Sequence, residues 1–192
     1  MKTIDSTTVV IVPGLRDHVP DHWQTLLAER LREQGWSVRT VQPLQENKQS
    51  CAARVAALEQ TLEGIDGPII LVAHSVGTLI TVHWSQQHKR QIKGALLAAP
   101  PDFDTPLPPG YSDPETLQRN GWTPVPRAPL PFPSIVAASR NDHLGTFERV
   151  EALAQLWGSR MVDLGRVGHL TPADGFGLWP MAEELICELD AA

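Results

Sequence analysis

Apolar and polar positions fall into two alternating kinds of segment from one end of the chain to the other. Short, mainly apolar runs predict buried strands, which lie at 7–12, 69–73, 92–98, 134–138 and 161–164, and a weaker strand pattern lies at 36–42. Apolar residues at helical spacing predict helices, which lie at 49–62, 76–87, 146–157 and 179–189, after a first one that follows Asp21 and ends at Gly35. Asp21 and Gln24 form the pattern of a capping box at the start of that first helix.

The strand segments are solid apolar runs with little alternation, which is typical of a parallel sheet covered by helices on both faces. Right-handed crossovers place the carboxyl ends of such strands, and the loops that follow them, at one edge of the sheet. A length of 192 residues suits one domain, so we expect a single α/β domain over 1–192.

One long segment, 100–133, interrupts this pattern and holds eleven of the seventeen prolines. Proline removes a backbone donor and fixes φ, so we expect neither regular helix nor sheet there. The segment leaves the carboxyl end of a strand, which is consistent either with a lid or pocket wall or with a plain surface excursion. Its aromatic residues Phe103, Tyr111 and Trp122 can dock it onto the rest of the protein.

The composition is that of a soluble globular protein, with 42% hydrophobic and 20% charged residues. The net charge of −6 comes without a basic stripe, which argues against a nucleic-acid partner and against an anionic membrane surface. No apolar run approaches the roughly 18 residues of a membrane span, and residues 1–6 lack the apolar core of a signal peptide. Cys51 and Cys187 show no metal-ligand or redox spacing and are expected to be reduced, partly buried thiols. These features predict a cytoplasmic protein and leave its oligomeric state open.

The strongest chemical signal is the turn between the strand at 69–73 and the helix at 76–87. Residues 73–77, A-H-S-V-G, have the G-x-S-x-G pattern of a nucleophile elbow, with alanine in place of the first glycine. Small residues are needed on both sides of the serine because the strand and the helix approach closely there. The helix begins at the serine, so its first amides and its dipole face any developing negative charge. Ser75 is therefore the candidate nucleophile; the plain alternative is a serine that only caps a helix.

A serine nucleophile needs a base, and α/β-hydrolases take it from the loop after the last strand. Of the seven histidines, His169 follows the strand at 161–164, and Gly168 before it permits an unusual backbone turn. His169 is therefore the candidate base. His143 is the other histidine late enough in the chain. It either lines the pocket or is merely exposed, and we favour the exposed position.

The base in turn needs an acid that orients it. Asp142 is the best placed, because it follows the strand at 134–138. Asp102 and Asp104 follow the strand at 92–98 and stay open as alternatives, since some hydrolases take the acid from that earlier strand. Asp163 lies too near His169 in sequence to reach round it.

An oxyanion hole needs two backbone donors aimed at the tetrahedral intermediate. The N–H of Val76 is one candidate, and the N–H of Leu15 is the other, because Gly14 allows that loop to come close. Arg16 lies at the expected pocket mouth and Trp122 in the proline-rich segment, and both are predicted to contact substrate. This chemistry implies no metal and no organic cofactor.

Together these motifs resemble the retinoblastoma-binding-protein-9-like and YdeN-like family of small serine hydrolases over almost the whole chain. The resemblance rests on V-P-G at 12–14, H-W at 22–23, H-S-V-G at 74–77, S-R-N-D at 139–142 and G-H at 168–169. It implies a compact α/β-hydrolase fold that lacks the first two strands of the full fold, with a six-stranded parallel sheet of order 2-1-3-4-5-6 and the same triad. Two residues depart from the family pattern: Ala73 stands at the elbow glycine, and His143 stands where proline often follows the acid.

The sequence thus predicts an enzyme that hydrolyses a small ester, thioester or amide through an acyl-Ser75 intermediate, with His169 moving the proton and Asp142 holding the imidazole tautomer. Family members resemble esterases or peptidases, and the motifs do not choose between these substrates. The alternative is a hydrolase fold that binds protein partners with little turnover, against which the complete triad argues. A dinucleotide-binding domain is disfavoured, because residues 12–16, V-P-G-L-R, lack the G-x-G-x-x-G turn.

Overall fold

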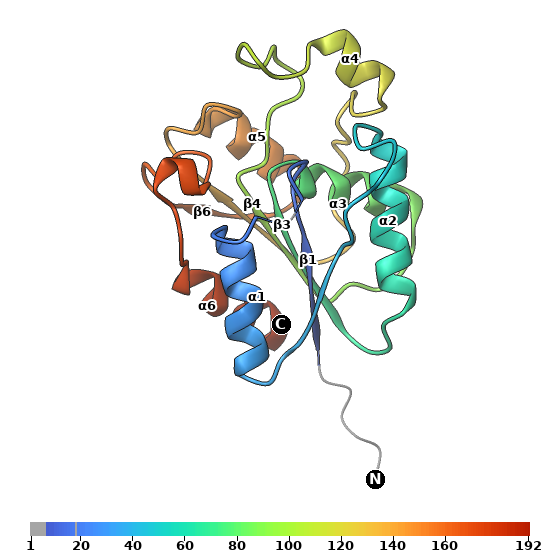
Figure 1. Cartoon of the computed structure of the whole chain (residues 1–192), viewed down its shortest axis with the longest axis vertical. Coiled ribbons are helices and arrows are strands. Elements are labelled where there is room, and N and C mark those ends of the chain that lie inside the picture. Colours follow the sequence, from blue (N-terminus) through green and yellow to red (C-terminus); the bar gives the residue numbers. More distant parts are fainter. Residues whose placement is uncertain (1–6, 18) are drawn as a thin grey trace.

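The computed structural model describes residues 7–17 and 19–192, so the expectation for residues 1–6 lies outside the described part. Six strands form one sheet in which every neighbouring pair is parallel, in the order β2-β1-β3-β4-β5-β6 (Figure 1). The strands are β1 (Thr8–Val12), β2 (Ser37–Thr40), β3 (Ile69–His74), β4 (Gly94–Ala98), β5 (Ser134–Ala138) and β6 (Arg160–Asp163). The predicted fold class and strand order are confirmed.

Helices cover both faces of the sheet, which explains why the central strands are apolar at every position. One face carries α1 (Trp23–Glu33) and α6 (Pro180–Ala191), which pack with Val9, Ile11 and Ile70. The other face carries α2 (Cys51–Glu63), α3 (Val76–Gln87) and α5 (Phe147–Trp157), which pack with Val10, Val12 and Leu71. None of the helices in the described part of the chain has the length and apolar character needed to cross a membrane.

The start of α1 differs from the predicted capping box. His22, not Asp21, is the N-cap residue, and its Nδ1 accepts a hydrogen bond from the N–H of Gln24 at 3.2 Å. The buried Gln24 side chain instead donates to the carbonyl of Val72 at 3.0 Å and to that of Val12 at 3.3 Å. Gln24 therefore ties α1 to the carboxyl ends of β1 and β3, a tertiary role that outweighs local capping.

The proline-rich segment connects β4 to β5 and rises above the carboxyl edge of the sheet (Figure 1). It contains one short helix, α4 (Pro114–Arg119), so the prediction that no helix forms there is wrong. Asp113 caps this helix by accepting from the N–H of Thr116 at 2.7 Å. Pro114 occupies the first turn, where a missing N–H has no cost.

The two cysteines differ in exposure. Both are free thiols, but Cys51 is buried at the start of α2 and Cys187 is exposed on α6. The expectation that both are partly buried is therefore wrong. Burial raises the pKa of the Cys51 thiol to about 12, so this thiol stays protonated at neutral pH.

The close packing of α3 against β1 makes a first prediction. A Cβ at Gly77 would collide with the carbonyl oxygen of Val12 and lie 2.9 Å from that of Pro13. Because both obstacles are backbone atoms, Gly77→Ala should lower the free energy of unfolding by about 3 kcal/mol in urea titrations. The matched control is Gly64→Ala, where nothing lies within 4 Å of the added atom and φ is −85°. The control should change stability by less than about 0.5 kcal/mol, and equal effects at the two sites would contradict this packing argument.

Candidate active site

Ser75 occupies the turn between β3 and α3, at the carboxyl edge of the sheet. Its backbone has φ 54° and ψ −129°, a conformation that residues other than glycine rarely adopt. The turn is held by the Ser75 N–H, which donates to the carbonyl of Ala98 at 3.0 Å. This strained turn presents the half-buried Ser75 side chain to the loops above the sheet.

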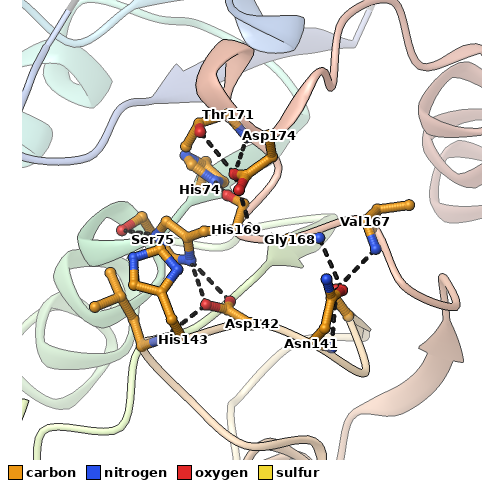
Figure 2. A network of polar contacts seen from close by, with 12 residues as sticks. His74, Ser75, Asn141, Asp142, His143, Val167, Gly168, His169, Thr171 and Asp174 are labelled. Carbon is orange, nitrogen blue, oxygen red and sulfur yellow. Dashed lines mark hydrogen bonds and ion pairs between the residues drawn. The ribbon is translucent and has the colours of Figure 1, made fainter. Parts of the chain in front are cut away.

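Three of the predicted site residues meet at this edge (Figure 2). His169 Nε2 lies 2.8 Å from Ser75 Oγ. On the other side of the ring, His169 Nδ1 lies 2.7 Å from Asp142 Oδ2 and 2.9 Å from Asp142 Oδ1. Asp142 and His169 are buried, and they follow β5 and β6 respectively. Asp142 Oδ1 also accepts from the N–H of Leu144 at 2.9 Å, which fixes the carboxylate plane.

The alternative acids lie elsewhere and have other partners. Asp102 is buried and accepts from Arg149 Nε at 2.8 Å and from Thr105 Oγ1 at 2.9 Å. Burial raises the pKa of Asp102, but the hydrogen bonds from Arg149 and Thr105 outweigh it and leave the pKa lowered. Asp104 pairs with Arg127 at 3.0 Å. The carboxylates of Asp102 and Asp104 are thus engaged by arginines, and it is Asp142 that contacts His169.

Asp163 also has a separate partner. It forms an ion pair with Arg140 at 2.5 Å and accepts from the N–H of Gly165. Asp163 is the last residue of the edge strand β6, and its carboxylate is engaged by Arg140 and Gly165.

The loop that carries His169 is shaped by left-handed backbone on both sides, with φ 63° at Gly168 and 55° at Leu170. Asp174 Oδ2 accepts from the N–H of His169 at 3.0 Å and from Thr171 Oγ1 at 2.6 Å. Asn141 Oδ1 accepts from the N–H of Gly168 at 2.9 Å, so the acid loop also holds the base loop (Figure 2). Sequence reasoning missed Asp174, although T-P-A-D at 171–174 has the capping-box spacing that could have found it.

The two predicted oxyanion donors lie beside Ser75. Val76 is the first residue of α3, so its N–H has no acceptor within the helix. The loop after β1 passes close to the nucleophile, because a Cβ at Gly14 would lie 3.3 Å from Ser75 Cβ and 3.7 Å from Ser75 Oγ. Leu15 follows Gly14, and both line the cavity at Ser75.

Arg54, on α2, anchors this loop and was not found from the sequence. Its buried guanidinium donates to Asp17 Oδ1 at 2.5 Å, to the carbonyl of Lys48 at 2.9 Å and to that of Leu15 at 3.4 Å. Asp17 has a left-handed backbone, with φ 56°. The loop therefore turns sharply at the residue that Arg54 binds. A contact across 37 positions leaves no local signal in the sequence.

A cavity of about 460 Å³ opens at Ser75, within the size range of small-molecule sites. Arg16 lines its mouth and is exposed. Trp122 also lines it, but its ring is buried and its Nε1 donates to the carbonyl of Gln49 at 2.7 Å. His143 is exposed, but it also lines the cavity, so the expectation that it is merely exposed is wrong. One of its ring nitrogens, Nε2, shares a hydrogen bond of 2.9 Å with Tyr111 Oη.

Two further histidines surround the candidate base. The His74 ring lies 4.6 Å from that of His22 and 5.1 Å from that of His169 between centroids. His74 Nε2 lies 2.8 Å from the carbonyl oxygen of His169, so this nitrogen carries the proton. Burial, and then the neighbouring His169, lower the pKa of His22 to about 4 and that of His74 well below its ordinary value. Within 7–17 and 19–192, no group of three His, Cys, Asp or Glu side chains is placed to hold a metal ion.

These neutral histidines predict how stability depends on pH. His22, His74 and His83 all have a lowered pKa in the folded state, so below about pH 6.5 the unfolded chain binds more protons than the folded protein. Their contribution is complete above pH 6.5 and decreases as the pH falls, at about 1.4 kcal/mol per pH unit for each proton taken up. For His22 this decrease continues to about pH 4. Urea titrations between pH 7.5 and 5 should show this fall, and His22→Asn, which keeps a capping residue, should make it shallower. An unchanged slope in the variant would contradict the argument.

A parallel sheet with a sharp strand–serine–helix turn at its carboxyl edge is the architecture of the α/β-hydrolases. Comparison with known protein families agrees with that class. The family model described as serine hydrolase matches residues 9–188. The chain belongs to this serine hydrolase family, and the resemblance to it is confirmed.

Solved structures place the chain beside YdeN-like hydrolases. A protein of Pectobacterium atrosepticum described as a YdeN-like hydrolase is 31% identical, with a TM-score of 0.79 over 96% of this chain and 90% of that chain. The ydeN gene product of B. subtilis is 19% identical, with a TM-score of 0.77 over 97% of this chain and 100% of that chain. Est1E of Butyrivibrio proteoclasticus shares the fold at 13% identity, with a TM-score of 0.72 over 100% of this chain and 91% of that chain. A search of curated proteins finds no match.

Proposed function

We propose that this hydrolase cleaves a small ester, thioester or amide through a covalent acyl-Ser75 intermediate. The observation that carries the proposal is the continuous hydrogen-bonded chain from Ser75 Oγ through His169 to Asp142, at 2.8 Å and 2.7 Å. These are the distances that a nucleophile, its base and the orienting acid require. The cavity beside Ser75 supplies room for a small-molecule substrate. The cytoplasmic location stays a prediction.

The proposed reaction follows from the contacts of each group. Asp142 accepts from Nδ1 of His169, so Nε2 is free of a proton and faces Ser75 Oγ. His169 removes the hydroxyl proton while Oγ attacks the carbonyl carbon, and the carbonyl oxygen becomes an oxyanion near the N–H groups of Leu15 and Val76. His169 then gives the proton to the leaving group. In the second half of the reaction, His169 removes a proton from water while the water oxygen attacks the acyl carbon. The carboxylic acid leaves, and Ser75 Oγ takes the proton back from His169.

Labelling with a fluorophosphonate tests this proposal. The intact protein should gain the mass of one phosphonyl group, located on Ser75 by peptide mapping. Before labelling, it should hydrolyse p-nitrophenyl acetate. The matched control is Ser112→Ala, which removes a second serine of the cavity wall and should label like the wild type. Labelling at another residue, or none together with no ester hydrolysis, would reject the acyl-serine mechanism and favour the binding-module alternative.

A further inference from the structure

The cavity at Ser75 has two chemically different parts. One part is formed by Leu15, Val76, Phe103, Leu107, Leu117 and Trp122, which belong to or pack against the core cluster beneath α2, α3 and α5. The other part is formed by Tyr111, Ser112, His143, His169, Thr171 and Asp174, whose side chains carry hydroxyl, imidazole or carboxylate groups. Ser75 adjoins both parts, because Val76 follows it in the chain and His169 Nε2 lies 2.8 Å from its Oγ.

Two polar residues that adjoin the apolar part are already engaged by other groups of the protein. The Phe103 and Trp122 rings pack edge to face, with centroids 6.0 Å apart. Asn120 also lines this part, but its Nδ2 donates to the carbonyl of Thr116 at 2.9 Å, and its own carbonyl accepts from the N–H of Cys51. Asp17 is paired with Arg54. A polar substrate group placed here would lose its hydrogen bonds to water without replacement, whereas an alkyl or aryl group would be stabilised.

The polar part is where a leaving group must lie. His169 Nε2 gives the proton to the departing oxygen or nitrogen, so that atom is close to the ring. Asp174 and Thr171 stand beside His169 (Figure 2). Burial raises the pKa of Asp174, but hydrogen bonds from Thr171 and the His169 N–H outweigh it, so the carboxylate is charged at neutral pH. Hydroxyl or ammonium groups on the leaving alcohol or amine find acceptors here.

We infer, resting on the proposed function, that the substrates are esters of apolar, medium-length acyl groups with small polar alcohols. The acyl group occupies the apolar part, and the alcohol occupies the polar part beside His169. At roughly 30 Å³ for each non-hydrogen atom, the volume of a water in the liquid, the cavity of about 460 Å³ holds roughly 15 such atoms. That corresponds to an acyl chain of about six to eight carbons together with a small alcohol.

The acyl part of the inference is tested with p-nitrophenyl esters of increasing chain length. Burial of each methylene should raise kcat/KM by about threefold to fourfold, which gives about 100-fold between the acetyl and hexanoyl esters. A flat or falling series, with Ser75 still labelled by the phosphonate and the acetate still hydrolysed, would overturn the acyl assignment alone. Absence of both labelling and hydrolysis would instead reject the proposed function on which it rests.

A pair of variants locates the acyl group. Leu107 is half-buried and packs against the outside of the core cluster. Leu107→Asp should therefore place a carboxylate against the acyl chain while the buried core residues stay in place. This variant should lower the ratio of kcat/KM for the octanoyl ester to that for the acetyl ester about tenfold or more. The control Leu156→Asp makes the same change at an exposed position on α5 and should alter neither ester. Equal losses on both esters in Leu107→Asp, with a native circular dichroism spectrum, would overturn the location.

The alcohol part is tested by comparing 1-hexanoylglycerol with pentyl hexanoate, which have the same acyl group and alcohols of equal heavy-atom count. Acid release in a pH-stat should give a higher kcat/KM for the glyceryl ester. The preference should narrow in Thr171→Val, which removes one hydroxyl of the polar part and keeps the size of the side chain. A preference for the pentyl ester in the wild type would overturn the assignment of the leaving group to the polar part.

Discussion

Ser75→Ala is expected to lower kcat for ester hydrolysis on the order of 10⁶-fold, because no other group can form the acyl intermediate. The variant keeps a side chain at the strained turn, and the atom it removes contacts His169 Nε2. The folded structure should therefore survive. The measurement is a steady-state assay with p-nitrophenyl acetate, corrected for hydrolysis without protein.

Two readouts separate loss of chemistry from loss of fold in this variant. Its urea midpoint should stay close to that of the wild type, and phosphonate labelling should disappear. Retention of most of the activity in a correctly folded Ser75→Ala protein would show that the reaction does not pass through this side chain.

Asp142→Asn should lower kcat on the order of 10⁴-fold by changing the tautomer of His169. Asp142 Oδ1 accepts from the N–H of Leu144, so in the variant the oxygen of the amide keeps that position. The amide nitrogen then replaces Oδ2, which lies 2.7 Å from His169 Nδ1. A donor opposite Nδ1 forces the ring proton onto Nε2, where it faces Ser75 and blocks proton removal. The comparison of kcat with wild type at pH 7 to 8 measures this effect.

Asp102→Asn is the matched control for the acid. Asp102 contacts Arg149 and Thr105, so its loss should reduce the free energy of unfolding while kcat changes less than about tenfold. A fall in kcat equal to that of Asp142→Asn, in a protein with native stability, would identify Asp102 as part of the catalytic machinery and refute the assignment of Asp142.

Much of the fold could be predicted because the spacing of hydrophobic residues, and the glycines and prolines that end helices and strands, determine secondary structure locally. The helix at 76–87 and the strand at 134–138 have the predicted bounds. The misses occur where a tertiary contact competes with a local rule. Gln24 satisfies strand carbonyls instead of completing a capping box, and α4 forms because Asp113 and Pro114 supply a helix start within a proline-rich stretch.

In the candidate site, too, features set by local sequence could be predicted, and features set by tertiary contacts could not. Ser75, Asp142 and His169 could be found from the sequence because each follows a strand, and parallel strands end at one edge. Arg54 and Asp174 could not be assigned roles in this way. Their effect depends on contacts with backbone atoms of Leu15 and His169, and such contacts exist only once the chain has folded.

The first turn of α2 has a consequence for attempts to change the range of substrates. The carbonyl of Gln49, just before this helix, accepts from Trp122 Nε1. The N–H of Cys51, its first residue, donates to the carbonyl of Asn120, so the proline-rich segment is bonded to the start of α2. One turn further along α2, Arg54 donates a hydrogen bond to the carbonyl of Leu15 in the loop at Ser75. Grafting the segment from a relative without its counterparts of Asn120 and Trp122 should loosen α2 and the loop at Ser75 together. Chimeras that keep these two residues and vary only the tip around Leu107 should redirect acyl preference while retaining turnover.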